Sequence, residues 1–134
     1  MSLLFILDTD TVSFALRDEG NVRVRLAHLK PSNVCISAVS LAELTFGASK
    51  RKSQKLHALI DAFTKDVQVV PFDAKAAQTF GSLSAALEDA GTPIGQLDTM
   101  IAAHALALGV TLVSNNTKHF AQVPGLSLEN WYPA

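Results

Sequence analysis

The stretch "LLFILDTDTVSF", residues 3–14, is an unbroken apolar run that ends directly in two aspartates. Leu3–Leu7 has the composition of a strand that is buried on both faces, as the strands of a parallel sheet are. Asp8 and Asp10 follow at once. Either could begin a helix as a cap or a first-turn acid, but a cap needs only one of them. The pair at a strand end therefore indicates a functional site.

Length and composition predict a single domain over residues 1–134. The apolar fraction of 49% is sufficient for a real core. No apolar run approaches the ~20 residues of a membrane span, and no basic region precedes the first run, so we expect neither a membrane segment nor a signal peptide. Cys35 is the single cysteine and cannot form an internal disulfide, which favours a cytoplasmic protein.

Short apolar runs alternate with helical patterns along the whole chain. This alternation predicts an α/β fold in three layers, with a parallel sheet of about five strands and six or seven helices. The expected strands are Leu3–Leu7, Val34–Ile36, Val67–Val70, Val110–Val113 and, more weakly, Leu126–Leu128. The expected helices are a short turn at Val12–Leu16 and longer segments at Val22–Leu29, Leu41–Ala48, Lys55–Lys65, Ala74–Ala90 and Asp98–Leu108.

Polar residues beside these strands are the candidates for chemistry, because ligands of open α/β sheets bind at the carboxyl ends of the strands. Glu43 follows the second run, where Ser40 and Glu43 also have the spacing of a capping box. Asp98 opens a helix that is apolar nearly all round, so its carboxylate needs a partner or a metal.

The fourth apolar run is followed by Ser114, Asn115, Asn116 and Thr117, which form either an ordinary turn or part of a ligand site. His104 lies on the opposite side of its helix from Asp98 and is interpreted as a core or flanking histidine. Cys35 is interpreted as a small buried apolar residue.

Asp8, Glu43 and Asp98 are thus expected to converge at one edge of the sheet, with Asn116 beside them. Three carboxylates would repel one another unless a cation lay between them. Oxygen ligands without His or Cys favour Mg²⁺ or Mn²⁺, and such sites serve phosphate chemistry.

This pattern resembles the PIN-domain ribonucleases and, among them, the VapC-type toxins of bacterial toxin–antitoxin pairs. "FILDTDTVSFAL" is similar to the opening strand and first acid of that family, and "ISAVSLAELTFGA" to its second segment. "GTPIGQLDTMIAAHALALGVTLVSNNTKHF" resembles its third and fourth segments in order, and "PGLSLENWYPA" its last strand and tail. The resemblance covers nearly the whole chain.

The resemblance implies a Mg²⁺- or Mn²⁺-dependent endoribonuclease with Asp8, Glu43 and Asp98 as metal ligands. Asn116 takes the fourth catalytic position, where the family often has Asp, so the number of metal ions stays open. Thr9, Asp10 and Ser114 are expected to position the ligands or the substrate; the role of Asp10 stays open between an outer carboxylate and a helix cap.

The resemblance also implies three partners: an RNA substrate, a small VapB-type antitoxin and a second copy of the chain. The net charge of −1 does not by itself indicate nucleic-acid binding. The local cluster Lys50, Arg51, Lys52 and Lys55 either meets the RNA backbone or is a solvated helix end.

Two other functions remain open at this point. "LDTDT" also fits the nucleophile motif of haloacid-dehalogenase-like phosphatases, with Asp8 as nucleophile, although the later Lys segment and acidic pair of those enzymes are missing. A catalytically inactive PIN-like binding module is the second alternative, favoured by Asn116 in place of Asp. Phosphate-binding P-loop and dinucleotide motifs are absent from the sequence.

Overall fold

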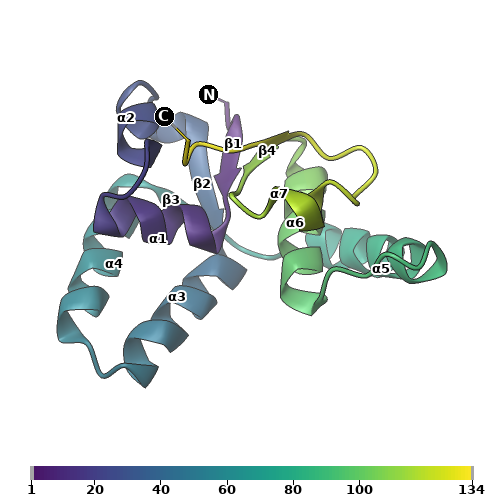
Figure 1. Ribbon diagram of the computed structural model, residues 1–134, viewed down its shortest axis with the longest axis horizontal. Coiled ribbons are helices and arrows are strands. Elements are labelled where there is room, and N and C mark those ends of the chain that lie inside the picture. The colour runs from purple at the N-terminus through teal and green to yellow at the C-terminus, as the bar shows by residue number, and fades with distance from the viewer. Residues whose placement is uncertain (1, 134) are drawn as a thin grey trace.

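A parallel five-stranded sheet runs through the middle of the molecule, with helices on both faces (Figure 1). The computed structural model describes residues 2–133. The strands are β1 (Phe5–Leu7), β2 (Val34–Ser37), β3 (Gln68–Val70), β4 (Thr111–Val113) and β5 (Leu128–Glu129). The helices are α1 (Thr9–Arg17), α2 (Val22–Ala27), α3 (Ala38–Lys50), α4 (Gln54–Asp66), α5 (Ala74–Asp89), α6 (Gln96–Leu108), α7 (Thr117–Phe120) and the 3₁₀ turn η1 (Pro31–Asn33).

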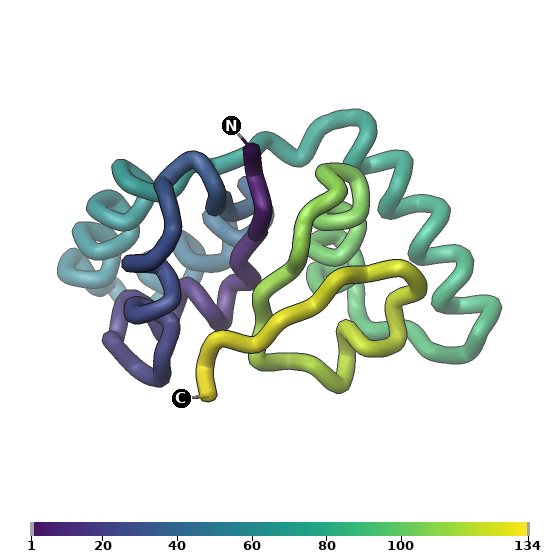
Figure 2. Tube along the Cα trace, turned by 90° about the horizontal axis from the view of Figure 1, so that it is seen from above, coloured from purple at the N-terminus to yellow at the C-terminus, as the bar shows by residue number. Residues whose placement is uncertain are grey.

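The strand order is β3-β2-β1-β4-β5, and every pair is parallel. The chain therefore adds two strands on one side of β1 and then switches to the other side. Figure 2 shows β1, in purple, between the blue and teal N-terminal half and the green segment that contains β4. The crevice at the carboxyl ends of β1 and β4 is the switch point at which ligands of such sheets bind.

The alternating side chains of the short strands supply two separate cores. Ile6 lies in register with Cys35 and Leu112, and all three join the core beneath α5 and α6. Leu7 lies in register with Ile36 and Val113, which face α1, α3 and α4 together with Trp131. Strands buried on both faces have the near-continuous apolar runs that the sequence shows.

The predicted architecture is confirmed, but several boundaries differ. The turn expected at Val12–Leu16 is the nine-residue helix α1, because Asp8 already caps it. Helix α3 begins at Ala38 and runs past Gly47 to Lys50. The last strand begins at Leu128, two residues later than Leu126. The short helix α7 was not predicted, because four residues carry too little periodicity.

None of the helices within residues 2–133 combines the length and the apolar character needed to cross a membrane.

Candidate functional site

Asp8 lies at the switch point of the sheet, where β1 ends beside β4. Its backbone N–H donates to the carbonyl of Val113 over 2.9 Å, so the residue is fixed against the end of β4. The residue is 6% exposed. A buried carboxylate at this place is costly unless it is hydrogen-bonded or charged groups compensate for it.

Both carboxylate oxygens of Asp8 accept hydrogen bonds. Oδ1 accepts from the backbone N–H of Thr9 over 2.8 Å, which makes Asp8 the N-cap of α1. Oδ2 accepts from the hydroxyl of Ser114 over 2.8 Å. The same hydroxyl accepts from the backbone N–H of Asn116 over 2.9 Å. Ser114 thus joins the loop after β4 to the carboxylate that ends β1.

Glu43 reaches this edge from α3, and Thr9 connects it to Asp8. The hydroxyl of Thr9 donates to Glu43 Oε1 over 2.5 Å. A charge-assisted hydrogen bond of this length fixes the orientation of the carboxylate. Of the two orientations open to Glu43 from the sequence, toward solvent or toward the carboxyl edge of the sheet, the structure has the second.

Asp10 lies in the first turn of α1, one turn away from the strand end. Its Oδ2 accepts from the backbone N–H of Asn115 over 3.1 Å, and its Oδ1 accepts from the Thr11 hydroxyl over 3.1 Å. Asp10 therefore ties α1 to the loop after β4. Its interpretation as the cap of the following helix is wrong, because Asp8 occupies that position.

Asp98 enters the site from the first turn of α6 and meets the loop after β4. Its Oδ2 lies 3.3 Å from Asn116 Nδ2 and 3.0 Å from His119 Nδ1. Asn116 Nδ2 and His119 Nδ1 are themselves 3.1 Å apart. Asp98 is thus placed with Asn116, as the sequence predicted, and with His119, which it did not.

Burial and neighbouring negative charge raise the pKa of two acids of this edge, Asp8 and Asp10. Burial and, after it, the charge of Asp10 raise the pKa of Asp8 from 3.8 to about 7, with a smaller contribution from Asp98. Burial also raises the pKa of Asp10, and the charge of Asp98 adds to this effect. Hydrogen bonds from Ser114 and Thr9 oppose the rise at Asp8 but do not cancel it.

No cationic side chain compensates for these acids in the way that a structural ion pair would. Among the ion pairs that the structure describes within residues 2–133, none involves Asp8, Asp10 or Glu43, and Asp98 meets only the imidazole of His119. Oxygen donors in a region of excess negative charge fit a divalent cation such as Mg²⁺ or Mn²⁺. Within residues 2–133, no group of three or more His, Cys, Asp or Glu side chains is arranged so that it could hold a metal ion. The site therefore fits a divalent cation by its charge and by the type of its donor atoms.

A small cavity of about 240 Å³ opens beside this edge. Thr9 and Glu43 line it on the side of the carboxylates, and Arg17 and Arg51 line it as well. Arg51 is the C-cap of α3 and belongs to the predicted basic cluster. One member of that cluster therefore adjoins the candidate site.

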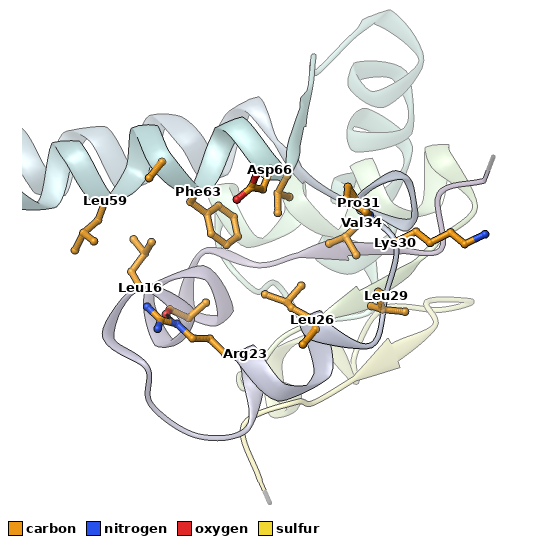
Figure 3. A pocket seen from close by; sticks show the side chains of 14 residues that line it. Leu16, Arg23, Leu26, Leu29, Lys30, Pro31, Val34, Leu59, Phe63 and Asp66 are labelled. Atoms are coloured by element: carbon orange, nitrogen blue, oxygen red, sulfur yellow. Dashed lines mark hydrogen bonds between the residues drawn. The ribbon is translucent and has the colours of Figure 1, made fainter.

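A second cavity, larger and mostly apolar, lies between α1, α2 and α4 (Figure 3). Its volume is about 440 Å³. In Figure 3, Leu59 and Phe63 of α4 lie on one side and Leu26 and Leu29 on the other. None of the four acids of the site lines this cavity, and most of its lining residues are apolar.

Three further sequence interpretations are decided by the structure. His104 is 1% exposed and hydrogen-bonds to the hydroxyl of Ser37, which confirms its place in the core. Cys35 is fully buried, as predicted. The capping box of Ser40 with Glu43 is wrong, because Ser37 caps α3 and Ser40 lies one turn inside the helix with its hydroxyl buried and without a hydrogen-bond partner.

His119 is the residue of this site that sequence reasoning missed. Its side chain comes to Asp98 only because α7 turns the chain back after Asn116. The available signal was a histidine three residues after Asn116, which is one helical turn and so the same face.

Comparisons with known proteins identify the family of this chain. The PIN domain family model matches residues 5–126. A tRNA(fMet)-specific endonuclease VapC from Shigella flexneri is 39% identical over 131 residues, covering 96% of this chain and 98% of that protein. A Ribonuclease VapC2 from Rickettsia felis is 36% identical over 132 residues, covering 96% of this chain and 98% of that protein.

The solved structure of VapBC2 from Rickettsia felis bound to a promoter DNA fragment contains a chain that matches with a TM-score of 0.90 at 36% identity. The match covers 96% of this chain and 99% of that one. DNA-bound VapBC from Salmonella typhimurium also matches with a TM-score of 0.90, at 37% identity over 96% and 98% of the two chains. The chain therefore belongs to the PIN-domain family and, within it, to the VapC ribonucleases of toxin–antitoxin systems.

Proposed function

We propose that this nuclease hydrolyses RNA phosphodiester bonds with the help of Mg²⁺ or Mn²⁺, and that Asp8, Glu43 and Asp98 are the ligands of the ion. The observation that supports this proposal best is the carboxylate of Asp8 at the switch point, whose pKa is raised to about 7 by its burial and, after that, by the charge of Asp10. A bound divalent cation would remove this repulsion. It would also lower the pKa of water and neutralise charge on the phosphoryl oxygens.

The remaining polar residues orient these carboxylates. Ser114 and the backbone of Thr9 fix the two oxygens of Asp8, and the hydroxyl of Thr9 holds Glu43. Hydrogen bonds that orient metal ligands commonly matter for activity nearly as much as the ligands do. We therefore assign Thr9 and Ser114 as positioning residues. Asn116 lies beside Asp98 and is assigned to the catalytic site with it.

Cleavage assays test the proposal directly. The purified protein is expected to cleave RNA with Mg²⁺ or Mn²⁺ and to stop when EDTA is added. Asp8→Asn should lose at least a hundredfold in rate, because it removes a charge from the centre of the site. Asp61→Asn, an exposed acid of α4 outside the site, is the control and should cleave at the parent rate. Equal cleavage by Asp8→Asn and the parent would disprove the assignment.

The two other readings of the sequence predict different results. The phosphatase interpretation is not favoured, because the family match covers the chain and the fold. An inactive PIN-like module would take up no Mg²⁺ or Mn²⁺ in calorimetry and would leave RNA intact. Initiator tRNA is the first substrate to assay, because two relatives carry the name tRNA(fMet)-specific endonuclease.

We further propose that Lys50, Arg51 and Lys52 contact the RNA backbone. All three are exposed, and Arg51 borders the cavity that Thr9 and Glu43 line. Replacing the three with Gln is expected to weaken RNA binding and to flatten its dependence on salt concentration, because fewer counterions are released. Lys75→Gln, on the exposed surface of α5, is the control. An unchanged salt slope in the triple variant would exclude the three residues.

A VapB-type antitoxin is the proposed protein partner, since several solved structures of similar chains are VapBC complexes. We propose that apolar residues of this antitoxin enter the cavity between α1, α2 and α4 (Figure 3). A homodimer of the chain is also proposed, as the family resemblance implies, and sedimentation of the purified protein tests it.

A further inference from the structure

Phe46 is an aromatic side chain that α3 leaves open to the solvent. It is 66% exposed, which is the largest fraction among the exposed large apolar residues within residues 2–133. An apolar ring in water adds nothing to the stability of the fold, because only its burial is favourable. Single exposed apolar residues are common on protein surfaces, so exposure alone assigns no role to the ring. The neighbours of Phe46 on α3 distinguish it from such residues.

Phe46 shares a face of α3 with Glu43 of the candidate site. The two residues are three positions apart, which on an α-helix is about 60° around the axis and about 4.5 Å along it. Helix α3 begins directly after β2 and extends away from the carboxyl edge of the sheet (Figure 1). Phe46 therefore lies one helical turn outward from Glu43, so an RNA strand that is bound at Glu43 and follows α3 passes over the ring.

The ring also lies beside a cation of the same helix. Lys50 Nζ is 5.9 Å from the centroid of the Phe46 ring. Aromatic rings that stack on bases, together with cations that follow the backbone, are the groups with which proteins bind unpaired nucleotides. An apolar protein surface that covered the ring would instead bury the charge of Lys50, which is costly. The charge therefore favours RNA over a protein as the molecule that covers Phe46.

Gly47, the next residue, leaves free space beside the ring. It lies in the interior of α3, where glycine is about 1 kcal/mol less favourable than alanine. Its φ is not in the left-handed region, so its backbone does not require glycine. Apart from its chain neighbours and the backbone of its own helix, no atom of residues 2–133 lies within 4 Å of the position of a Cβ. Gly47 lines the same cavity as Glu43, and its missing side chain keeps that cavity open next to Phe46.

We propose that Phe46 stacks on an unpaired base of the RNA, next to the phosphate bound at the candidate site, and that Gly47 leaves room for this base. The inference rests on the proposed function, because it takes the RNA to be bound at Glu43 and Lys50. Bases inside a duplex are stacked on one another and cannot reach the ring, so the contact favours single strands and loops. Every base has a flat face, so stacking on Phe46 adds affinity for unpaired RNA with little preference among the bases.

Two RNA probes test this inference: a single strand of about 12 nucleotides, and the same strand annealed to its complement. Fluorescence anisotropy in EDTA measures the affinity for each probe. Phe46→Ala should weaken binding of the single strand at least about fivefold and leave binding of the duplex unchanged. The dependence of its affinity on salt concentration should match the parent's, because no cation is lost. Phe46→Trp should bind the single strand at least as tightly as the parent, whereas Phe46→Leu should be as weak as Phe46→Ala, because leucine is apolar but not flat.

Gly47→Leu tests the space beside the ring. It should weaken binding of the single strand, because the new side chain takes the place of the base. Its thermal unfolding temperature should stay at or above the parent's, because leucine is the better helix former. Gly81→Leu is the matched control, since Gly81 lies inside α5 and also has open space at the position of a Cβ. Val24→Ala, at another exposed apolar residue, is the control for Phe46→Ala. Both controls should bind both probes as the parent does.

The outcomes separate this inference from the function on which it rests. If the parent binds neither probe, the proposed action on RNA fails and this inference fails with it. If the parent binds and cleaves RNA but Phe46→Ala keeps the parent's affinity for the single strand, the proposed function stands and Phe46 does not contact the RNA. Equal losses for the single strand and the duplex, or parent-like binding by Phe46→Leu, would exclude stacking. A changed sedimentation coefficient of Phe46→Ala with unchanged RNA affinity would assign the ring to a contact between protein chains.

Discussion

At the scale of single residues, Asp8 combines two roles that usually fall to different side chains. It caps α1 through Oδ1, and it places its other oxygen at the switch point of the sheet. The cap satisfies one backbone N–H of the helix, which stabilises the fold whether or not the carboxyl is charged. The negative charge of the Asp8 carboxylate is not needed for the cap. Burial and the charge of Asp10 both disfavour it.

The raised pKa of Asp8 predicts a pH-dependent stability for the metal-free protein. The folded-state pKa of about 7 lies above the ordinary 3.8, so folding favours the protonated form. The resulting stability is complete below pH 3.8 and is lost as the pH rises to about 7. In EDTA, the free energy of unfolding of the parent, relative to Asp8→Asn, should fall by about 2.5 kcal/mol between pH 5 and pH 8.

Urea denaturation of both proteins at the two pH values measures this difference. Asp8→Asn is the appropriate comparison because an Asn oxygen can still accept from the N–H of Thr9 and keep the cap. Excess Mg²⁺ at pH 8 should restore the parent and leave the variant unchanged. If the free energies of unfolding of parent and variant respond equally to pH, the pKa of Asp8 is not raised in the folded protein.

The site residues that directly follow a strand could be predicted from the sequence, because the end of the strand determines where they lie. Asp8 and Ser114 directly follow apolar runs, so their location was determined once the runs were read as parallel strands. His119 depends on the path of a four-residue helix, and no pattern in the sequence specifies that path. Ser40 was misinterpreted because a pattern was present but misleading. Its spacing from Glu43 is typical of a helix cap, yet it lies one turn inside α3 with its hydroxyl buried.

At the scale of the elements, α3 connects the two halves of the site. Its N-cap Ser37 accepts from the backbone N–H of Val39 and also contacts His104 Nδ1 of α6 over 2.8 Å. Helix α3 carries Glu43 and helix α6 carries Asp98. The contact between Ser37 and His104 therefore joins the two helices that present these acids.

Two serines of α3 give a matched pair of variants. Ser37→Ala removes the cap and leaves His104 without its partner in the core, so it should cost about 1–2 kcal/mol of stability. Ser40→Ala removes a buried hydroxyl that has no hydrogen-bond partner and introduces a better helix former. It should leave stability unchanged or raise it by up to about 1 kcal/mol.

Chemical denaturation of the two variants checks this prediction, with the parent protein in the same buffer. The opposite order, with Ser40→Ala the less stable of the two, would mean that the Ser40 hydroxyl has a partner in solution.

At the scale of the whole molecule, the acidic site and the apolar cavity lie in different regions of the fold. The switch between β1 and β4 brings the acids of α1, α3 and α6 to one edge of the sheet. The apolar cavity between α1, α2 and α4 lies on the face that buries Leu7 and Ile36. Helix α1 borders both regions, because it begins at Asp8 and ends beside the cavity at Leu16. A partner in the cavity therefore packs against the helix that presents Asp8.

Ala62 tests whether the antitoxin uses this cavity, because it lines the cavity from α4 and is exposed in the free chain. Ala62→Glu should leave folding and RNA cleavage intact, since Ala62 is exposed in the free chain. It should weaken binding of a purified VapB-type antitoxin at least tenfold, because docking would bury an unpaired carboxylate. Ala77→Glu, the same change on the exposed surface of α5, should bind the antitoxin as the parent does. Calorimetry measures both affinities, and an unchanged affinity for Ala62→Glu would place the antitoxin on another face of the molecule.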